Sequence, residues 1–302
     1  MDPETLQKCL KAGKIAAQVR RETAAKLEKP GTSFLAAMDF AEERIVKLGG
    51  GIAWAQMALN EVAAHFCPQE DDTQVSKAGD VIKVDIGVHL DGYIADNAMT
   101  VQVATKDYTD MIKAAQNALR SAIKLVRPGV QLWELGEAQS SEAEALGFTT
   151  VKNLSGHTIE RYKVHAGISI PSYNTKDKTE LQEGWQIAIE PFVTNGVGKI
   201  AEKGIPTIFM VESSRSTRSL YARKILDQVK SQHGLPFTTR WLTRKLGTGT
   251  TAFGMRELVK EGIIHSYAPL SEVSKGMVAQ FEHSMIVKDK PLVYTRHDDD
   301  GW

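Results

Sequence analysis

Two aspartates beside a predicted turn are the first residues whose types and spacing suggest chemistry. Asp85 and Asp96 flank the turn signal Leu90-Asp91-Gly92. If the turn contains two residues, both carboxylates point to one face of a hairpin, directly opposite or one diagonal apart. A three-residue turn would put them on opposite faces. Because two bare carboxylates side by side repel each other unless cations neutralise them, the hairpin predicts a site for a pair of metal ions.

Three further residues extend this set. Glu190 and Glu282 each follow a short apolar run, and His157 comes after a glycine in a turn. Singly, each glutamate is better interpreted as an ordinary edge-strand charge. Asp85, however, lies inside a strongly apolar strand, where a charge is costly unless it is paired or bound to metal. Four carboxylates and one imidazole form a mixed ligand set that suits Mn, Fe, Co or Zn better than Ca or Mg, but the pattern names no reaction.

The remaining histidines are weighed individually. His165 lies eight residues after His157, an even step that places both on one face if the strand is regular. His65 follows an Asn-Glu-Val-Ala-Ala segment. His283 alternates to the face opposite Glu282. Because a lone histidine is more often structural than functional, we interpret the following ones as structural: His89, His233, His265, His283 and His297.

The elements that must position these residues follow from periodicity and from Gly and Pro punctuation. Helices are predicted over 3–27, 33–48, 108–126 and 132–146. Strands are predicted over 81–89, 93–103, 148–154, 158–165, 185–193 and 277–288. Two helices followed by strands, twice over, predict an α+β fold with two structurally similar halves.

Two segments lie outside this repeating order. Residues 196–275 are predicted to form a small helical insertion that is dense in Arg and Lys. Interspersed acidic residues and few aromatic ones favour a solvated helix face over a nucleic-acid patch. The terminal segment 297–300 is predicted to be a solvated tail.

Composition sets broad limits. The chain has 302 residues, 42% of them hydrophobic and 25% charged, and its 37 Lys and Arg balance its 37 Asp and Glu. A global basic field for nucleic acid or anionic membrane is therefore absent. Two cysteines, Cys9 and Cys67, fit a reducing cytosol rather than a disulfide scaffold. The start lacks the pattern of a signal peptide, and no apolar run approaches the roughly 20 residues of a membrane span. These features predict a cytoplasmic globular protein.

Several segments, in order from residue 63 to residue 283, resemble methionine aminopeptidases of type II, in the short form without an N-terminal extension, of peptidase family M24. They are Ala63-Ala64-His65, 83–89 (KVDIGVH), 92–96 (GYIAD), 153–157 (NLSGH) leading to His165-Ala166-Gly167, 189–192 (IEPF) and 280–283 (QFEH). The resemblance implies one catalytic domain over 1–302 with the pita-bread fold: a curved antiparallel sheet between two pseudo-symmetric αβ halves. It also implies a helical insertion subdomain, 196–275, between the last two metal-binding glutamates.

The resemblance further implies two divalent metal ions per chain (Co, Mn, Fe or Zn) held by five ligands. By analogy with the family, Asp96 and Glu282 bridge the metals, Asp85 chelates one, and His157 and Glu190 hold the other.

The catalytic roles also come from the resemblance. Glu190 would shuttle the proton of the attacking water. His65 and His165 would contact the substrate and stabilise the tetrahedral intermediate.

The activity so implied is the removal of the initiator methionine from nascent polypeptides whose second residue is small. The implied setting is a cytoplasmic monomer that meets nascent N-termini, with the ribosome as a further partner and without a membrane or a specific nucleic acid. One segment departs from the family. Many relatives have Phe-Pro before His65, whereas this chain has Ala53-Trp54-Ala55-Gln56-Met57, so Trp54 is expected to replace the family aromatic at the methionine pocket.

Two alternatives remain. An aminopeptidase P or prolidase of the same fold would cleave next to proline. A catalytically inactive relative would act as a binding scaffold, and the presence of all five acceptors counts against it.

Overall fold

The computed structural model describes residues 1–300. The helices are α1 (Pro3–Leu27), α2 (Phe34–Lys47), α3 (Thr109–Leu125), α4 (Leu132–Ala145), α5 (Leu220–Val229), α6 (Thr239–Leu246), α7 (Thr248–Lys260) and the short 3-10 turns η1 (Lys230–Gln232) and η2 (Asp298–Asp300). The strands are β1 (Gly51–Leu59), β2 (Val62–Ala64), β3 (Val81–Leu90), β4 (Tyr93–Gln102), β5 (Thr149–Thr150), β6 (Ser155–Ile159), β7 (Ser169–Pro171), β8 (Gln186–Ile189), β9 (Phe192–Thr194), β10 (Ile200–Glu202), β11 (Ile208–Val211), β12 (Phe237–Thr238), β13 (Ile264–Tyr267), β14 (Leu270–Glu272), β15 (Val278–Gln280), β16 (His283–Ile286) and β17 (Leu292–Val293).

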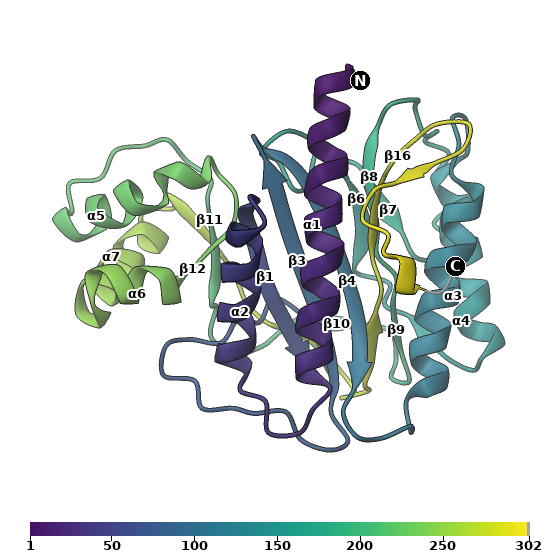
Figure 1. The fold of residues 1–302 in the computed structure, drawn as a ribbon, viewed down its shortest axis with the longest axis horizontal. Coiled ribbons are helices and arrows are strands. Elements are labelled where there is room, and N and C mark those ends of the chain that lie inside the picture. Colours follow the sequence, from purple (N-terminus) through teal and green to yellow (C-terminus); the bar gives the residue numbers. More distant parts are fainter. Residues whose placement is uncertain (301–302) are drawn as a thin grey trace.

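The N-terminal half is a three-stranded antiparallel sheet, β1-β3-β4, with helices on one face. The long helix α1 crosses β3 and β4, and α2 packs beside it on β1 (Figure 1). The β3–β4 hairpin has a two-residue turn, Asp91-Gly92, whose φ values of 51° and 86° are the left-handed pair that suits a tight hairpin. Of the two turn lengths that the sequence left open, the two-residue turn is therefore the one that forms.

The C-terminal half is a five-stranded antiparallel sheet in the order β17-β16-β8-β6-β7, and α3 and α4 lie on its side of the molecule (Figure 1). The two halves meet where β4 runs beside the segment joining β15 to β16. Ala98 and Glu282 exchange backbone hydrogen bonds there, of 3.4 and 3.1 Å. The Ser284 hydroxyl accepts from the Asp96 backbone N–H at 3.0 Å and donates to the Asp96 carbonyl at 2.8 Å. These contacts join the two sheets at the residues proposed as ligands.

Apolar burial follows the same layering. The largest core lies between the helices α1 to α4 and the strands they cover. A separate core lies within the segment between β10 and β14, where α5, α6 and α7 pack against the small sheet β12-β11-β13 (Figure 1). Residues 196–275 thus contain strands as well as the helices that the sequence predicted. Within residues 1–300, no helix is both long and apolar enough to cross a membrane.

Some predicted strands are shorter or broken. Only the first two residues of the strand predicted over 158–165 are in a strand, because β6 ends at Ile159 and the chain reverses through a Glu160–Lys163 bridge. Of the strand predicted over 148–154, only β5 forms. The strand predicted over 277–288 divides into β15 and β16, with Glu282 in the irregular segment between them. Pairing breaks there because β15 hydrogen-bonds to β9, whereas β16 hydrogen-bonds to β8.

The prediction of a solvated tail over 297–300 is also wrong. These residues include η2, and the Asp300 carboxylate accepts hydrogen bonds of 2.6 and 2.8 Å from the guanidinium of Arg20, which is 1% exposed on α1. Arg120 on α3 donates to the Asp300 carbonyl at 3.0 Å. A run of acidic residues predicts a solvated segment. Here the buried Arg20 supplies a positive charge, and its ion pair with Asp300 holds the segment against the helices.

Candidate metal centre and catalytic pocket

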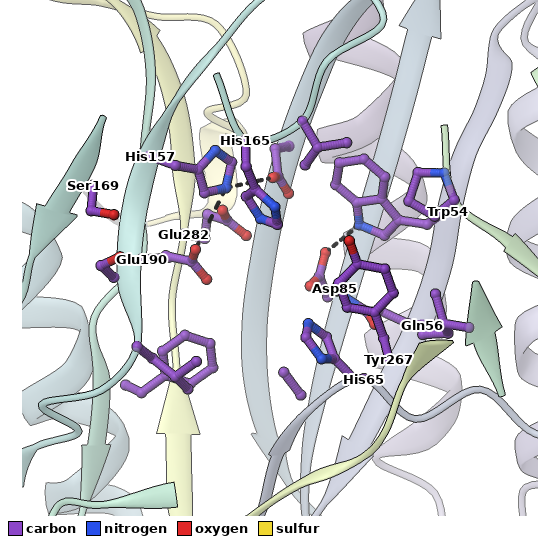
Figure 2. A pocket seen from close by; sticks show the side chains of 18 of the residues that line it. Trp54, Gln56, His65, Asp85, His157, His165, Ser169, Glu190, Tyr267 and Glu282 are labelled. Atoms are coloured by element: carbon purple, nitrogen blue, oxygen red, sulfur yellow. Dashed lines mark hydrogen bonds and ion pairs between the residues drawn. The ribbon is translucent and has the colours of Figure 1, made fainter. Parts of the chain in front are cut away.

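A cavity of about 380 Å³ lies at the junction of the two halves. Carboxylates and imidazoles from both sheets line its floor (Figure 2). Apolar side chains of the segment between β10 and β14 complete its rim, namely Ile208, Met210, Pro236 and Tyr267. All seven residues that the sequence analysis proposed for the site line this cavity: His65, Asp85, Asp96, His157, His165, Glu190 and Glu282.

Three of these residues are arranged as ligands of one ion would be. Asp96, His157 and Glu282 are buried and offer ligand atoms that all lie within 4.8 Å of one another. His157 Nε2 lies 3.6 Å from Asp96 Oδ2 and 3.6 Å from Glu190 Oε1, which places Glu190 at the edge of the same group (Figure 2). In the part of the chain that the structure describes, the buried oxygens Asp96 Oδ1 and Glu282 Oε1 have no hydrogen-bond partner. Buried carboxylate oxygens without a donor are what a cation site requires.

Asp85 lies beside this group but has partners of its own. Asp85 pairs with Ala98 and Gly87 pairs with Asp96 across the hairpin, so the two carboxylates share a face one diagonal apart. The Trp54 indole N–H donates to Asp85 Oδ1 at 2.7 Å, and the Gln56 amide donates to Asp85 Oδ2 at 2.6 Å (Figure 2). The sequence analysis missed these two donors. Their signal is visible only once β1 is known to pair with β3, which sets Gln56 opposite Asp85.

The electrostatics of the four carboxyl groups favour bound cations. Burial raises the pKa of Asp85 to about 6 against the lowering effect of its two hydrogen bonds. Burial and then repulsion from neighbouring carboxylates raise the pKa values of Asp96, Glu190 and Glu282 well above their usual range. Such shifts are typical of acids that share a site without a countercharge.

The nearby imidazoles do not supply that countercharge. Burial, and then the neighbouring His165, lower the pKa of His157 to about 3 and that of His65 to about 4. Burial also lowers the pKa of His165. Neutral imidazoles are the form in which histidine binds metals, and four carboxylates can offset the charge of divalent cations. The donor set therefore fits metal ions.

The two histidines predicted to contact the substrate, His65 and His165, both line the cavity (Figure 2). The His165 ring lies 4.5 Å from the His157 ring, centroid to centroid and perpendicular to it. The sequence analysis expected His157 and His165 on one face of a regular strand, but β6 ends at Ile159 and the strand does not continue to His165. The turn after β6, rather than a regular strand, returns His165 to the site, and Ala166 then donates to the Thr158 carbonyl at 2.8 Å. His65 follows β2 in a left-handed conformation with φ of 64° and contacts the Tyr267 ring edge-on at 5.3 Å.

The histidines interpreted as structural do not line the cavity. His283 points away from it, as the alternation with Glu282 predicted, and its Nδ1 lies 3.0 Å from the Thr295 hydroxyl.

Comparisons with known proteins agree with this architecture. The family model described as metallopeptidase family M24 matches residues 7–289. The chain is 45% identical over 293 residues to a Pyrococcus horikoshii protein named methionine aminopeptidase, and the match covers 96% of this chain and 99% of that protein. Among solved structures, a thermophilic Arx1 aligns with a TM-score of 0.85 at 15% identity, over 96% of this chain and 90% of that one. Methionine aminopeptidase of Thermotoga maritima aligns with a TM-score of 0.72 at 21% identity, over 98% of each chain. At such identities, the two structures support the fold alone.

Proposed function

The chain belongs to metallopeptidase family M24 and is a metal-dependent aminopeptidase that removes N-terminal methionine, and we propose that five of its residues hold two divalent metal ions for this reaction. Its fold is the pita-bread fold that the sequence resemblance implied. The proposed ligands are Asp85, Asp96, His157, Glu190 and Glu282. The observation that carries the proposal is the buried group of Asp96, His157 and Glu282, in which Asp96 Oδ1 and Glu282 Oε1 have no hydrogen-bond partner among residues 1–300.

The arrangement supports a division of labour among the ligands. Asp96 and Glu282 are central, and each has a buried oxygen without a hydrogen-bond partner that would be available to an ion. Asp85 lies on the Asp96 side, and His157 lies within 3.6 Å of Glu190 on the other. Two divalent cations held by these residues would lower the pKa of a bound water and polarise the scissile carbonyl. Co, Mn, Fe and Zn all suit this ligand set.

The chain's own groups complete the chemistry. Glu190 Oε1 lies at the edge of the ligand group, 3.6 Å from His157 Nε2, so its carboxylate is placed to accept the proton of the attacking water and release it to the leaving amine. His65 and His165 are held neutral by burial, and each can donate one N–H to substrate oxygen or to the oxyanion. We assign the catalytic proton transfer to Glu190 and substrate contact to His65 and His165.

The substrate is proposed to be a nascent polypeptide with Met followed by a small residue. The apolar wall formed by Trp54, Ile208 and Met210 supports binding of a methionine side chain. Residues 196–275 are proposed to form an insertion subdomain within one catalytic domain, 1–302, and their own apolar core supports this.

We also propose that this chain acts in the cytoplasm as a monomer near the ribosome, where nascent N-termini emerge. Residues 213–260 contain ten basic and two acidic residues. Arg240 and Arg244 pair with acidic residues outside this segment, and the other eight basic residues leave a formal charge of +6 in a chain of net charge zero. Such local charge supports an encounter with an anionic surface. Cosedimentation with ribosomes that weakens as salt rises would support this part of the proposal, and its absence at low salt would contradict it.

The decisive experiment compares Met-Ala-Ser with an X-Pro peptide, with and without a chelator. We expect hydrolysis of Met-Ala-Ser that the chelator abolishes and a divalent metal restores. Preference for the X-Pro peptide would instead indicate an X-Pro peptidase. Asp96→Ala should lose both metal and activity, whereas Asp107→Ala, at an exposed aspartate just beyond β4, should retain both. A purified protein that binds no divalent metal, or full activity in Asp96→Ala, would refute the two-metal mechanism and favour an inactive scaffold or another site.

A further inference from the structure

We propose that Trp54 and Gln56 form a two-donor clamp that fixes the Asp85 carboxylate in position to chelate a metal ion before the ion arrives. The inference rests on the proposed metal centre and adds two positioning residues to it. Each donates one hydrogen bond to a different oxygen of the same carboxylate, at 2.7 and 2.6 Å.

The clamp is built by the pairing of β1 with β3. A bulge between Ile52 and Trp54 shifts the register so that Trp54 lies opposite Gly87 and Gln56 lies opposite Asp85. Trp54 and Gln56, two residues apart, then share the face on which Asp85 stands. Without the bulge, a one-residue shift would turn the indole to the other face of the sheet.

Glycine at position 87 makes room for the indole. A Cβ at Gly87 would lie 2.3–2.6 Å from three ring carbons of Trp54, so any side chain there would displace the ring. The indole therefore lies flat over the backbone of β3, and its edge N–H reaches the neighbouring Asp85. Trp54 is 8% exposed and packs among Ile94, Val164 and Leu235, so its orientation is set by packing as well as by the hydrogen bond.

The lone pairs of the Asp85 carboxylate explain why the hydrogen bonds from Trp54 and Gln56 do not prevent Asp85 from binding a metal ion. Each carboxylate oxygen has two lone-pair sites, and one donor occupies one of them. Both oxygens keep a lone pair for an ion in the cavity, so the clamp leaves a bidentate face free. Hydrogen bonds to ligating carboxylates fix their orientation, and losing such a partner typically costs 10–100-fold in metal affinity.

The surroundings of Gln56 support its role as a hydrogen-bond donor to Asp85. Its amide Oε1 is buried and has no hydrogen-bond partner among the described residues, whereas its Nε2 donates to Asp85. The Gln56 amide N–H therefore donates to Asp85, while the Gln56 amide oxygen accepts no hydrogen bond. A side chain placed only for packing would not leave that oxygen buried and unpaired.

The test is calorimetric titration of Mn²⁺ into the metal-free protein, which needs no catalysis. Trp54→Phe keeps a ring and removes the donor, and Gln56→Met keeps the length of the side chain and removes the amide. In either variant, we expect the affinity of one Mn²⁺ ion to fall about 10- to 100-fold while the affinity of the other is unchanged. Trp241→Phe is the matched control, because its indole also donates to a carboxylate, that of Glu42 at 2.9 Å, outside the cavity.

The outcomes separate the clamp from the metal centre. If the wild-type protein binds two Mn²⁺ ions and both variants bind them as tightly as Trp241→Phe, the clamp is refuted and the centre stands. Tighter binding in the variants would also refute the clamp, because the donors would then compete with the metal. If the wild-type protein does not bind two ions, the proposed centre fails and the clamp fails with it. Should Trp54→Phe not fold, Gln56→Met decides alone.

Discussion

Replacing Asp300 with asparagine should destabilise the protein far more than its place at the end of the chain would indicate. The Asp300 carboxylate is the acceptor for Arg20, whose side chain is 1% exposed beneath η2. It also lies 3.6 Å from His283 Nε2. Removing one partner of a buried ion pair costs about 3–5 kcal/mol, because the other charge is left without compensation. The loss of stability cannot exceed the free energy needed to detach residues 297–300 from the helices, because water would then reach Arg20.

Urea unfolding of the protein, kept metal-free by a chelator at neutral pH, measures this loss. The urea concentration at the unfolding midpoint should fall, while the dependence of the unfolding free energy on urea concentration should stay unchanged. Asp298→Asn is the matched control, because Asp298 belongs to the same η2 turn but is exposed. Replacing both partners, as in Arg20→Met with Asp300→Leu, should recover most of the loss, because no buried charge remains. A loss in Asp300→Asn equal to that in Asp298→Asn, or a double variant as unstable as the single one, would refute the reasoning.

Three further predictions concern the pocket and the helices around it. His65→Ala and His165→Ala should each lower kcat by about 10²–10³-fold with bound metal unchanged, and a loss of metal would instead mark the residue as a ligand. Burial lowers the pKa of His65 from 6.5 to about 4, so the unfolded chain takes up a proton first as the pH falls. The stability that this group contributes above pH 6.5 is therefore lost as the pH falls from 6.5 to 4. In metal-free protein, the unfolding free energy of His65→Gln should fall by about 3 kcal/mol less over this pH range than that of the wild type. Gly136→Ala should destabilise the protein by about 1–3 kcal/mol, because the new Cβ would lie 2.1 Å from the Tyr173 carbonyl oxygen. Gly249→Ala on α7, where a Cβ would meet nothing within 4 Å, should instead stabilise it by about 0.4–1 kcal/mol in the same urea assay.

The sequence predicts best where local signals agree. Helices α1 to α4 begin and end within a few residues of their predicted bounds, because caps, glycines and apolar periodicity coincide there. The β3–β4 hairpin follows from Asp91-Gly92, whose backbone conformation only a narrow set of residues adopts. Once that turn has two residues, the shared face of Asp85 and Asp96 follows from the alternation of side chains along the strands.

Features that depend on distant pairing could not be predicted in this way. Periodicity cannot show that β1 lies beside β3, so the donors to Asp85 were not foreseen. The return of His165 depends on a turn after β6 that carries no strong Gly or Pro signal within 160–163. Asp300 reads as solvated because its partner, Arg20, is a basic residue in a long helix, and nothing local shows that this arginine is buried.

The junction of the two sheets also sets the order in which this protein can mature. The hydrogen bond between Asp96 and Ser284 joins residues 188 positions apart, and Glu282 lies beside Ser284. A contact this distant in sequence forms only after nearly the whole chain has been synthesised and has collapsed. The β3–β4 hairpin can bring Asp85 and Asp96 together early, but a site that also includes Glu282 would be complete only after the two halves have met, unlike small zinc domains, where the ligands are close in sequence. The complete five-residue site would therefore be available to metal only in chains whose two halves have already joined.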